Sequence, residues 1–153
     1  MTLVEKLADA RKSGDYQALF DVVPYSKFLG LSARLDGSEL ITTMAFAPHL
    51  IGNPALPALH GGTLGALLES AAIFELLVRA ETIVLPKTIT LTVDYLRSAK
   101  PVDTHAHATV TRQGRRVTNV RVEAWQGDRG SLVATANAIF LVMPAEESAA
   151  SSS

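Results

Sequence analysis

The segment from Gly62 to Ala80 constrains the fold most strongly, because it is apolar almost all round a helical circumference. Paired glycines and Thr63 mark the start of a predicted helix, and Thr82-Ile83-Val84 with Pro86 marks its end. A helix without a wide polar face must be covered on most sides. The sequence therefore predicts a core helix wrapped by a sheet, or covered by a sheet and a second subunit.

Glu69 is the one carboxylate within the apolar run Thr63–Phe74 of this helix. Small and apolar residues surround it on a helical wheel: Gly62, Gly65, Ala66, Ala72, Ile73, Leu76 and Ala80. The opposite side carries Leu67, Ala71, Phe74 and Val78. Because removing an ionised group from water costs several kcal/mol in effect, such a group is normally paired, neutralised or used. Residue chemistry leaves two interpretations open, a reactive carboxylate or a paired structural glutamate at a helix interface.

The flanking segments predict an α+β fold with two strands, one buried helix and four further strands. Apolar spacing from about Leu3 to Phe20, broken near Ser13-Gly14, predicts short helices within an N-terminal helical segment, residues 1–29. The predicted strands are Leu31–Asp36, Glu39–Phe46, Thr88–Tyr95, His105–Arg112, Val117–Gln126 and Leu132–Val142. Three prolines predict an ordered loop over Ala47–Leu59. We expect one domain, residues 1–143, and a disordered tail, residues 144–153.

Composition and charge exclude several classes of function. The chain of 153 residues has no cysteine, which excludes disulfides, thiolate zinc sites and a cysteine nucleophile. Its net charge of −1 predicts no nucleic-acid partner and no attraction to anionic membranes. The mixed charges of Met1–Leu7 do not resemble a signal peptide, so we expect a cytoplasmic protein. The apolar run Leu56–Val78 is interrupted by His60, Glu69 and Glu75, and we expect no membrane span.

The start of the long helix has the character of an oxyanion site. Gly61 and Gly62 would present backbone N–H groups without side chains in the way, and the helix dipole favours negative charge there. Glu69 lies about 10 Å further along the axis than Gly62. Asn53 and His60 flank the preceding loop and could hydrogen-bond a water or a carbonyl, or serve the structure alone.

Other catalytic signals are weak or missing. His105 and His107 would share one strand face, but no third ligand of suitable spacing accompanies them, and we predict no metal site. The chain has no Gly-x-Ser-x-Gly elbow, P-loop or dinucleotide-binding fingerprint.

Five short stretches together resemble a known family. They are Asn53-Pro54, Leu59-His60-Gly61-Gly62, Glu69, Val93-Asp94-Tyr95-Leu96-Arg97 and Arg112-Gln113-Gly114-Arg115-Arg116. This pattern, over roughly residues 30–143, resembles the hotdog-fold acyl-CoA thioesterases of the phenylacetate-degradation (PaaI-like) group. The resemblance implies a long central helix wrapped by a five- to six-stranded antiparallel sheet. It also implies a homodimer or a dimer of dimers, which would be a homotetramer, with active sites at the interface.

The same resemblance implies roles for individual residues. The Gly61 N–H, next to His60, would polarise the thioester carbonyl, and Glu69 of the partner subunit would act as general base or nucleophile. Asn53 and Thr88 are further catalytic candidates. The residues implied in coenzyme A binding are Gly62, Tyr95, Arg97, Lys100, Arg112, Gly114, Arg115 and Arg116. No cofactor is expected, because coenzyme A is part of the substrate. The alternatives are a hotdog hydratase or dehydratase and a non-catalytic acyl-CoA binding module.

Overall fold

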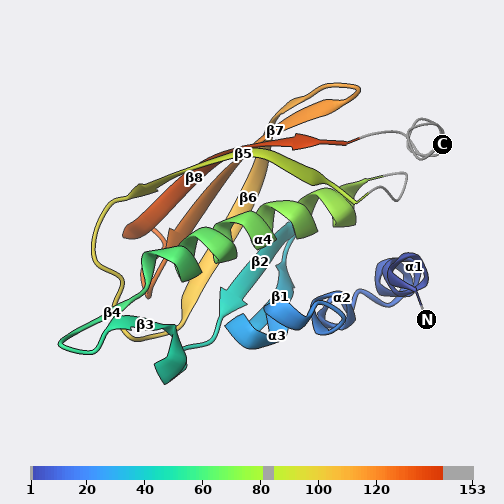
Figure 1. The fold of residues 1–153 in the computed structure, drawn as a ribbon. Helices are drawn as coiled ribbons and strands as arrows, with labels where there is room; N and C mark the ends of the chain where they lie inside the picture. The colour runs from blue at the N-terminus through green and yellow to red at the C-terminus, as the bar shows by residue number, and fades with distance from the viewer. Residues whose placement is uncertain (1, 81–84, 143–153) are drawn as a thin grey trace, which may run out of the picture.

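A computed structural model describes residues 2–80 and 85–142, as one α+β arrangement of a sheet wrapped around a helix (Figure 1). The predicted tail, residues 144–153, and residues 82–84, which were predicted to mark the end of the long helix, lie outside the described residues. The helices are α1 (Leu3–Ser13), α2 (Gln17–Asp21), α3 (Pro24–Leu29) and α4 (Gly61–Arg79). The strands are β1 (Leu31–Asp36), β2 (Glu39–Met44), β3 (Ile51–Asn53), β4 (Leu56–Leu59), β5 (Lys87–Tyr95), β6 (Thr104–Gln113), β7 (Val117–Trp125) and β8 (Leu132–Leu141).

Six strands form one antiparallel sheet in the order β1-β2-β6-β7-β8-β5. The six strands predicted from alternation are confirmed, with ends that differ by at most two residues. The first hairpin turns at Gly37 and Ser38, since Asp36 pairs with Glu39 and Gly37 has φ 62°. Strands β1 and β5 form the two edges of the sheet, so β5 has a partner, β8, on one side only.

The prediction of a plain loop over Ala47–Leu59 is wrong. Pro48–Leu50 forms a 3-10 helix, and β3 and β4 form a small separate antiparallel ribbon. Pro57 lies inside β4, which a two-stranded ribbon tolerates because a strand with one neighbour does not need every N–H group. The pairing is irregular at Asn53, which faces both Leu56 and Ala58.

The inner face of the sheet is lined by alanines, which allows α4 to lie close to it. Ala106, Ala108, Ala124, Ala134, Ala136 and Ala138 are all buried on β6, β7 and β8. From the helix, Leu64, Leu67, Leu68, Ala71 and Phe74 fill the space against them. The small sheet residues and large helix residues complement each other, as close packing requires.

Helix α4 is covered on most sides, but one face stays partly open in the single chain. The N-terminal helices cover a second side, where Phe20 stacks on Phe74 with ring centroids 3.7 Å apart. Arg11 of α1 donates to the carbonyls of Leu77 and Ala80 and so caps the last turn of α4. The face that remains partly or fully exposed carries Gly62, Ala66, Glu69, Ser70 and Ile73. One chain therefore meets only part of the covering requirement predicted for this helix.

By length and composition alone, α4 would be long and apolar enough to cross a membrane. Its 19 residues include a window of mean hydropathy 1.5, a value that a largely buried core helix also reaches. About half of that window, 56%, is buried within the fold. The contacts of α4 with the sheet and with α1–α3 make it the core helix of this domain.

Candidate active site

The N-terminus of α4 is held by His60, which acts as the N-cap. The Gly62 N–H donates to Nδ1 of His60 at 2.9 Å, so Nδ1 is the unprotonated nitrogen of the ring. The His60 carbonyl in turn accepts from the N–H and the hydroxyl of Thr63, at 2.9 and 2.6 Å. His60 thus has a structural function, as acceptor for one of the unpaired N–H groups of the first turn.

Only one of the two glycine N–H groups predicted as oxyanion donors remains available. The Gly62 N–H is engaged by His60, which corrects the expectation that both are free. The Gly61 N–H has no acceptor among the residues that the structure describes. As the first residue of α4, Gly61 points this group out of the helix, where the dipole favours an anion.

Tyr95 of β5 packs against this first turn. Its hydroxyl donates to the Gly61 carbonyl at 2.8 Å, and a Cβ added to Gly61 would lie 3.3 Å from the Tyr95 ring. Gly65, one turn later, lies close to Tyr95 and Val93 of the same strand. The two glycines therefore allow β5 to approach the start of α4. The family resemblance implied a role for Tyr95 in coenzyme A binding. Its contact with Gly61 has no signal in the sequence, because the two residues are 34 apart in the chain.

A hollow of about 350 Å³ opens beside these groups. Its lining comes from β4, the start of α4, the end of β5 and the segment after it: Ala58, Leu59, Gly61, Leu64, Tyr95, Leu96, Arg97, Ser98 and Ala99. Arg97 and Gly61 therefore line the same hollow. Lys100 follows directly, and the side-chain amide of Gln126 bonds its backbone N–H and carbonyl at 3.0 and 2.8 Å.

Glu69 lies on the open face of α4 and is partly buried. In the described part of the chain, no hydrogen bond or salt bridge reaches its carboxylate. The other glutamate of the helix, Glu75, behaves differently, since it is 7% exposed and pairs with Arg79 at 2.8 Å. Within one chain, the interpretation of Glu69 as a paired structural carboxylate therefore has no support.

Two predicted catalytic residues, Asn53 and Thr88, are not among the residues that line this hollow. The Asn53 side chain accepts from the Ala55 N–H at 3.0 Å and stabilises the turn between β3 and β4. Thr88 is exposed near the start of β5, seven residues before Tyr95 and next to an irregularity in the pairing with β8. Asn53 pairs with Ala58, which does line the hollow, so Asn53 lies nearer to it than Thr88 does.

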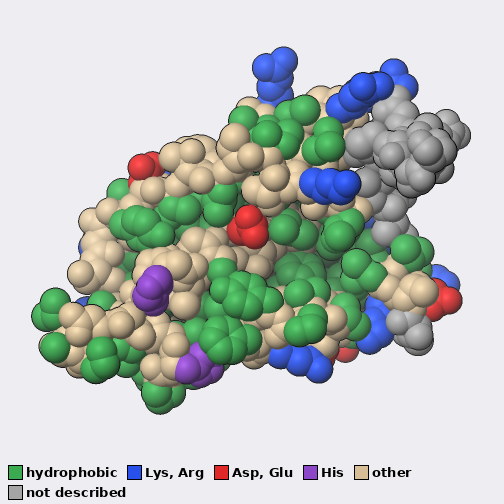
Figure 2. All heavy atoms as spheres, viewed as in Figure 1, with side chains coloured by type: hydrophobic (Ala, Val, Ile, Leu, Met, Phe, Trp, Pro, Cys, Tyr) green, Lys and Arg blue, Asp and Glu red, His purple; other side chains and the backbone are tan. Residues whose placement is uncertain are grey.

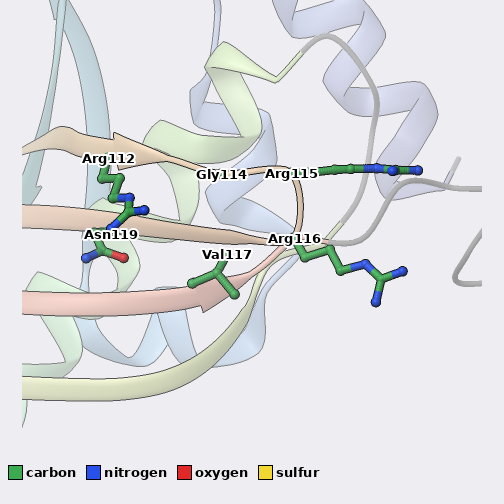
Figure 3. Close-up of a pocket in the computed structure, with 6 residues that line it drawn as sticks. All are labelled: Arg112, Gly114, Arg115, Arg116, Val117 and Asn119. Carbon is green, nitrogen blue, oxygen red and sulfur yellow. The ribbon is translucent and has the colours of Figure 1, made fainter.

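The predicted arginine cluster surrounds a second, open hollow of about 480 Å³ at the β6–β7 turn (Figure 3). It is lined by Arg112, Gly114, Arg115, Arg116, Val117 and Asn119. Arg115 and Arg116 extend beyond the turn, whereas Arg112 and Asn119 lie back along the strands (Figure 3). Gly114 has a steric role here, because a Cβ would lie 2.7 Å from the Val117 carbonyl oxygen.

The strand register places the two hollows at opposite ends of the sheet. Tyr95 pairs with Ala134, whereas Val117 pairs with Leu141, which also pairs with Lys87 at the start of β5. Lys87 and Tyr95 are eight residues apart, which corresponds to about 26 Å along a strand. Arg112, Arg115 and Arg116 therefore do not share one site with Gly61 and Arg97 of the same chain.

The two strand histidines lie on the outer face of the sheet, away from α4. His105 shares a hydrogen bond with Thr43 at 2.7 Å, and His107 lies 3.5 Å from Glu39. The hydrogen bond from Arg129 lowers the pKa of the Glu39 carboxyl, and His107 adds to this shift. Across residues 2–80 and 85–142, no group of three or more His, Asp or Glu could hold a metal ion.

Comparisons with known proteins agree on one family. Residues 52–141 match the family described as "Acyl-CoA thioesterase N-terminal domain". The chain is 31% identical to the medium/long-chain acyl-CoA thioesterase YigI of Salmonella typhimurium, over 78% of this chain and 86% of the relative.

Solved structures with the same fold include two with substantial sequence identity. A crystal structure of a Chromobacterium violaceum protein is 37% identical, with a TM-score of 0.75 over 92% of this chain and 98% of that chain. A phenylacetic acid degradation-related protein from Ralstonia eutropha is 30% identical, with a TM-score of 0.69 over 78% and 91% of the two chains.

Proposed function

Because the chain belongs to the acyl-CoA thioesterase family and has the hotdog fold, we propose that it hydrolyses medium- or long-chain acyl-CoA to a carboxylic acid and free coenzyme A. The chain length of the acyl group is suggested by the name of the YigI relative. The observation that carries the mechanism is the geometry of α4, with an unengaged N–H at Gly61 and an unpaired carboxylate at Glu69. A cytoplasmic location is part of this proposal.

In this proposal, the Gly61 N–H donates to the thioester oxygen as negative charge develops on it. A preorganised donor of this kind typically supplies about 3 kcal/mol of transition-state stabilisation. His60 supports it by occupying the neighbouring N–H, and Tyr95 supports it by holding the Gly61 carbonyl. Both contacts fix the first turn of α4 before substrate binds.

The carboxylate that acts with this donor comes from a second subunit. Gly61 and Glu69 are eight residues apart, which is about 12 Å along one helix axis. A reacting carbonyl about 3 Å from each group bridges only about 6 Å. Two antiparallel copies of α4 can bring Glu69 of one chain to Gly61 of the other. Glu69 then activates water as general base or attacks the carbonyl itself.

The edge strand β5 is the proposed place of subunit contact. It is nine residues long, pairs on one side only, and exposes Ile89 and Tyr95. An unpaired edge of this length is a template for another strand. We infer a homodimer in which two β5 strands pair in antiparallel fashion, and a dimer of dimers remains compatible with this arrangement.

In this dimer, the hollow at Gly61 of one subunit lies near the arginine-lined hollow of the partner subunit. Antiparallel pairing places the Lys87 end of the partner's β5 beside Tyr95, and the partner's β6–β7 turn lies at that end. The lateral distance from Tyr95 to the partner's β7 is then about three strand spacings, roughly 14 Å. The partner's Arg112, Arg115 and Arg116 could contact the phosphates of coenzyme A, since guanidinium groups bind phosphate oxygens in bidentate fashion.

The test of the chemistry is Glu69→Gln, with Ser70→Ala as the matched control on the same open face. We expect Glu69→Gln to lower kcat for thiol release from acyl-CoA by about 10²- to 10⁴-fold while the melting temperature is retained. Ser70→Ala should keep both. A Glu69→Gln protein with normal kcat and a lower melting temperature would show a structural glutamate and refute the mechanism.

The phosphate contacts are tested separately with Arg115→Ala combined with Arg116→Ala. We expect KM to rise for acyl-CoA and to stay constant for a short acyl-pantetheine thioester, which has no nucleotide phosphates. An equal rise for both substrates would contradict the assignment of this turn to coenzyme A.

A further inference from the structure

Helix α3 exposes an aromatic pair that the proposed chemistry does not use. Tyr25 and Phe28 are 54% and 53% exposed, while Ser26 and Leu29 bury the other side of the helix. The two rings lie nearly parallel, with centroids 5.9 Å apart and an interplanar angle of 8°. Full burial of a large apolar side chain typically contributes about 1.5–3 kcal/mol, so two neighbouring exposed rings form a ready apolar binding surface.

This pair is held in a defined position relative to the start of α4. Nε2 of His49 lies 2.7 Å from the Phe28 carbonyl, and the His49 ring lies 4.7 Å from the Phe28 ring. The next residue, Leu50, is fully buried, and its carbonyl accepts the His60 N–H at 2.8 Å. The contacts thus run without a gap from Phe28 through His49 and Leu50 to the cap of the candidate active site.

The surroundings of the pair are apolar. Figure 2 shows hydrophobic side chains gathered in a strip between α3 and α4, with an acidic side chain at the upper edge of the strip. Ile73 lies on the open face of α4 and is only partly buried, whereas Leu50 and Leu64 are buried in the core. An aliphatic chain is therefore better suited to the strip than a charged or polar ligand.

The position of α3 indicates that the proposed subunit contact at β5 does not cover Tyr25 and Phe28. Helices α2 and α3 pack on β1, at one edge of the sheet, whereas β5 forms the opposite edge. The second subunit proposed to pair with β5 approaches α4 from the β5 edge, whereas α3 lies towards the β1 edge. Helix α3 also contacts α4, and the hydrophobic strip between the two helices adjoins the face of α4 that stays open (Figure 2).

We propose that Tyr25 and Phe28 bind the distal part of the substrate's acyl chain and so determine chain-length preference. This inference rests on the proposed thioesterase function. The thioester lies at the N-terminus of α4, and the aliphatic chain extends over the open face of α4 onto the two rings. Short acyl groups end before the rings, so the pair contributes to binding of medium and long chains only.

The experiment compares thiol release from butyryl-, octanoyl-, dodecanoyl- and palmitoyl-CoA for the full chain. The variants are Tyr25→Ala, Phe28→Ala, the double variant and Phe28→Leu, which keeps an apolar side chain. Val4→Ala and Leu35→Ala serve as controls, because both residues are exposed hydrophobics on other elements. We expect the double variant to lower kcat/KM for dodecanoyl-CoA about tenfold or more, mainly through KM, and to change butyryl-CoA turnover less than about twofold. Phe28→Leu should retain most of the preference.

Each contrary result points to one cause. Variants that keep the wild-type chain-length profile, or lose activity equally on all four substrates, overturn the assignment of the rings while the thioesterase function stands. Dissociation of the oligomer in the double variant, measured by sedimentation, overturns it in favour of a contact between copies of this chain. A wild-type protein that hydrolyses none of the four substrates refutes the proposed function itself.

Discussion

The contact between Gly61 and Tyr95 gives the sharpest test of how the candidate oxyanion donor is positioned. A Cβ added at Gly61 would lie 3.3 Å from Cε1, Cζ and the hydroxyl oxygen of Tyr95, closer than an ordinary van der Waals contact. Tyr95 is 55% exposed, so its ring can move outward by a few tenths of an ångström. That movement would weaken the 2.8 Å hydrogen bond from Tyr95 to the Gly61 carbonyl.

The expected cost of Gly61→Ala follows from these two effects. A neutral hydrogen bond contributes about 0.5–1.5 kcal/mol, and exposure puts this one at the lower end. Since misplacing a catalytic group by about 1 Å can cost about 10²-fold in rate, a shift of a few tenths of an ångström should lower kcat about 3- to 10-fold. Gly65→Ala is the matched control, because its Cβ would lie 3.8 Å from the Tyr95 hydroxyl, an ordinary contact.

The assay is a double-mutant cycle on kcat for thiol release. In a Tyr95→Ala background the clash is gone, so Gly61→Ala should have almost no further effect, which corresponds to a coupling energy of about 1 kcal/mol. Gly65→Ala should keep kcat and raise helix stability slightly. If Gly61→Ala lowers kcat by the same factor in both backgrounds, Tyr95 does not position the first turn of α4 and the reasoning is wrong.

Three further predictions concern other contacts. Arg11→Met should lower the free energy of unfolding by about 2–3 kcal/mol, because two carbonyls at the C-terminal end of α4 lose a charged donor. Urea denaturation at a fixed protein concentration measures this change. The control variant Lys12→Met should leave the free energy of unfolding nearly unchanged. The lowered pKa of Glu39 means that its bond to Arg129 stabilises the fold above the ordinary pKa of a glutamate, and that this contribution is lost as the pH falls through the lowered value. Glu39→Gln should therefore flatten the acid limb of the melting temperature at pH values below the ordinary pKa of a glutamate, and an unchanged limb would contradict this. Gly114→Ala should move the β6–β7 turn, because the new Cβ would contact the Val117 oxygen at 2.7 Å, and KM for acyl-CoA should rise while kcat is retained.

The sequence by itself determined the core helix and the six strands of the main sheet, because each of them has a local signature. Alternation of apolar residues identified the strands, and an apolar circumference from Gly62 to Ala80 identified the core helix. The β3–β4 ribbon was missed because the three prolines of the segment Ala47–Leu59 are typical of a loop. Glu69 was noticed for the same local reason, a charge where the surrounding pattern is apolar.

Only the tertiary structure decided which candidates share a site, since that depends on strand register and on contacts between distant segments. The sequence shows two adjacent glycines, Gly61 and Gly62, as possible oxyanion donors. In the structure His60 accepts the Gly62 N–H, and the Gly61 N–H remains the available donor. Arg97 and Arg112 look equivalent as phosphate ligands, but the register places them at opposite ends of the sheet. Hydrophobic periodicity records which face of an element is buried, whereas it contains no information on which two buried or exposed faces meet.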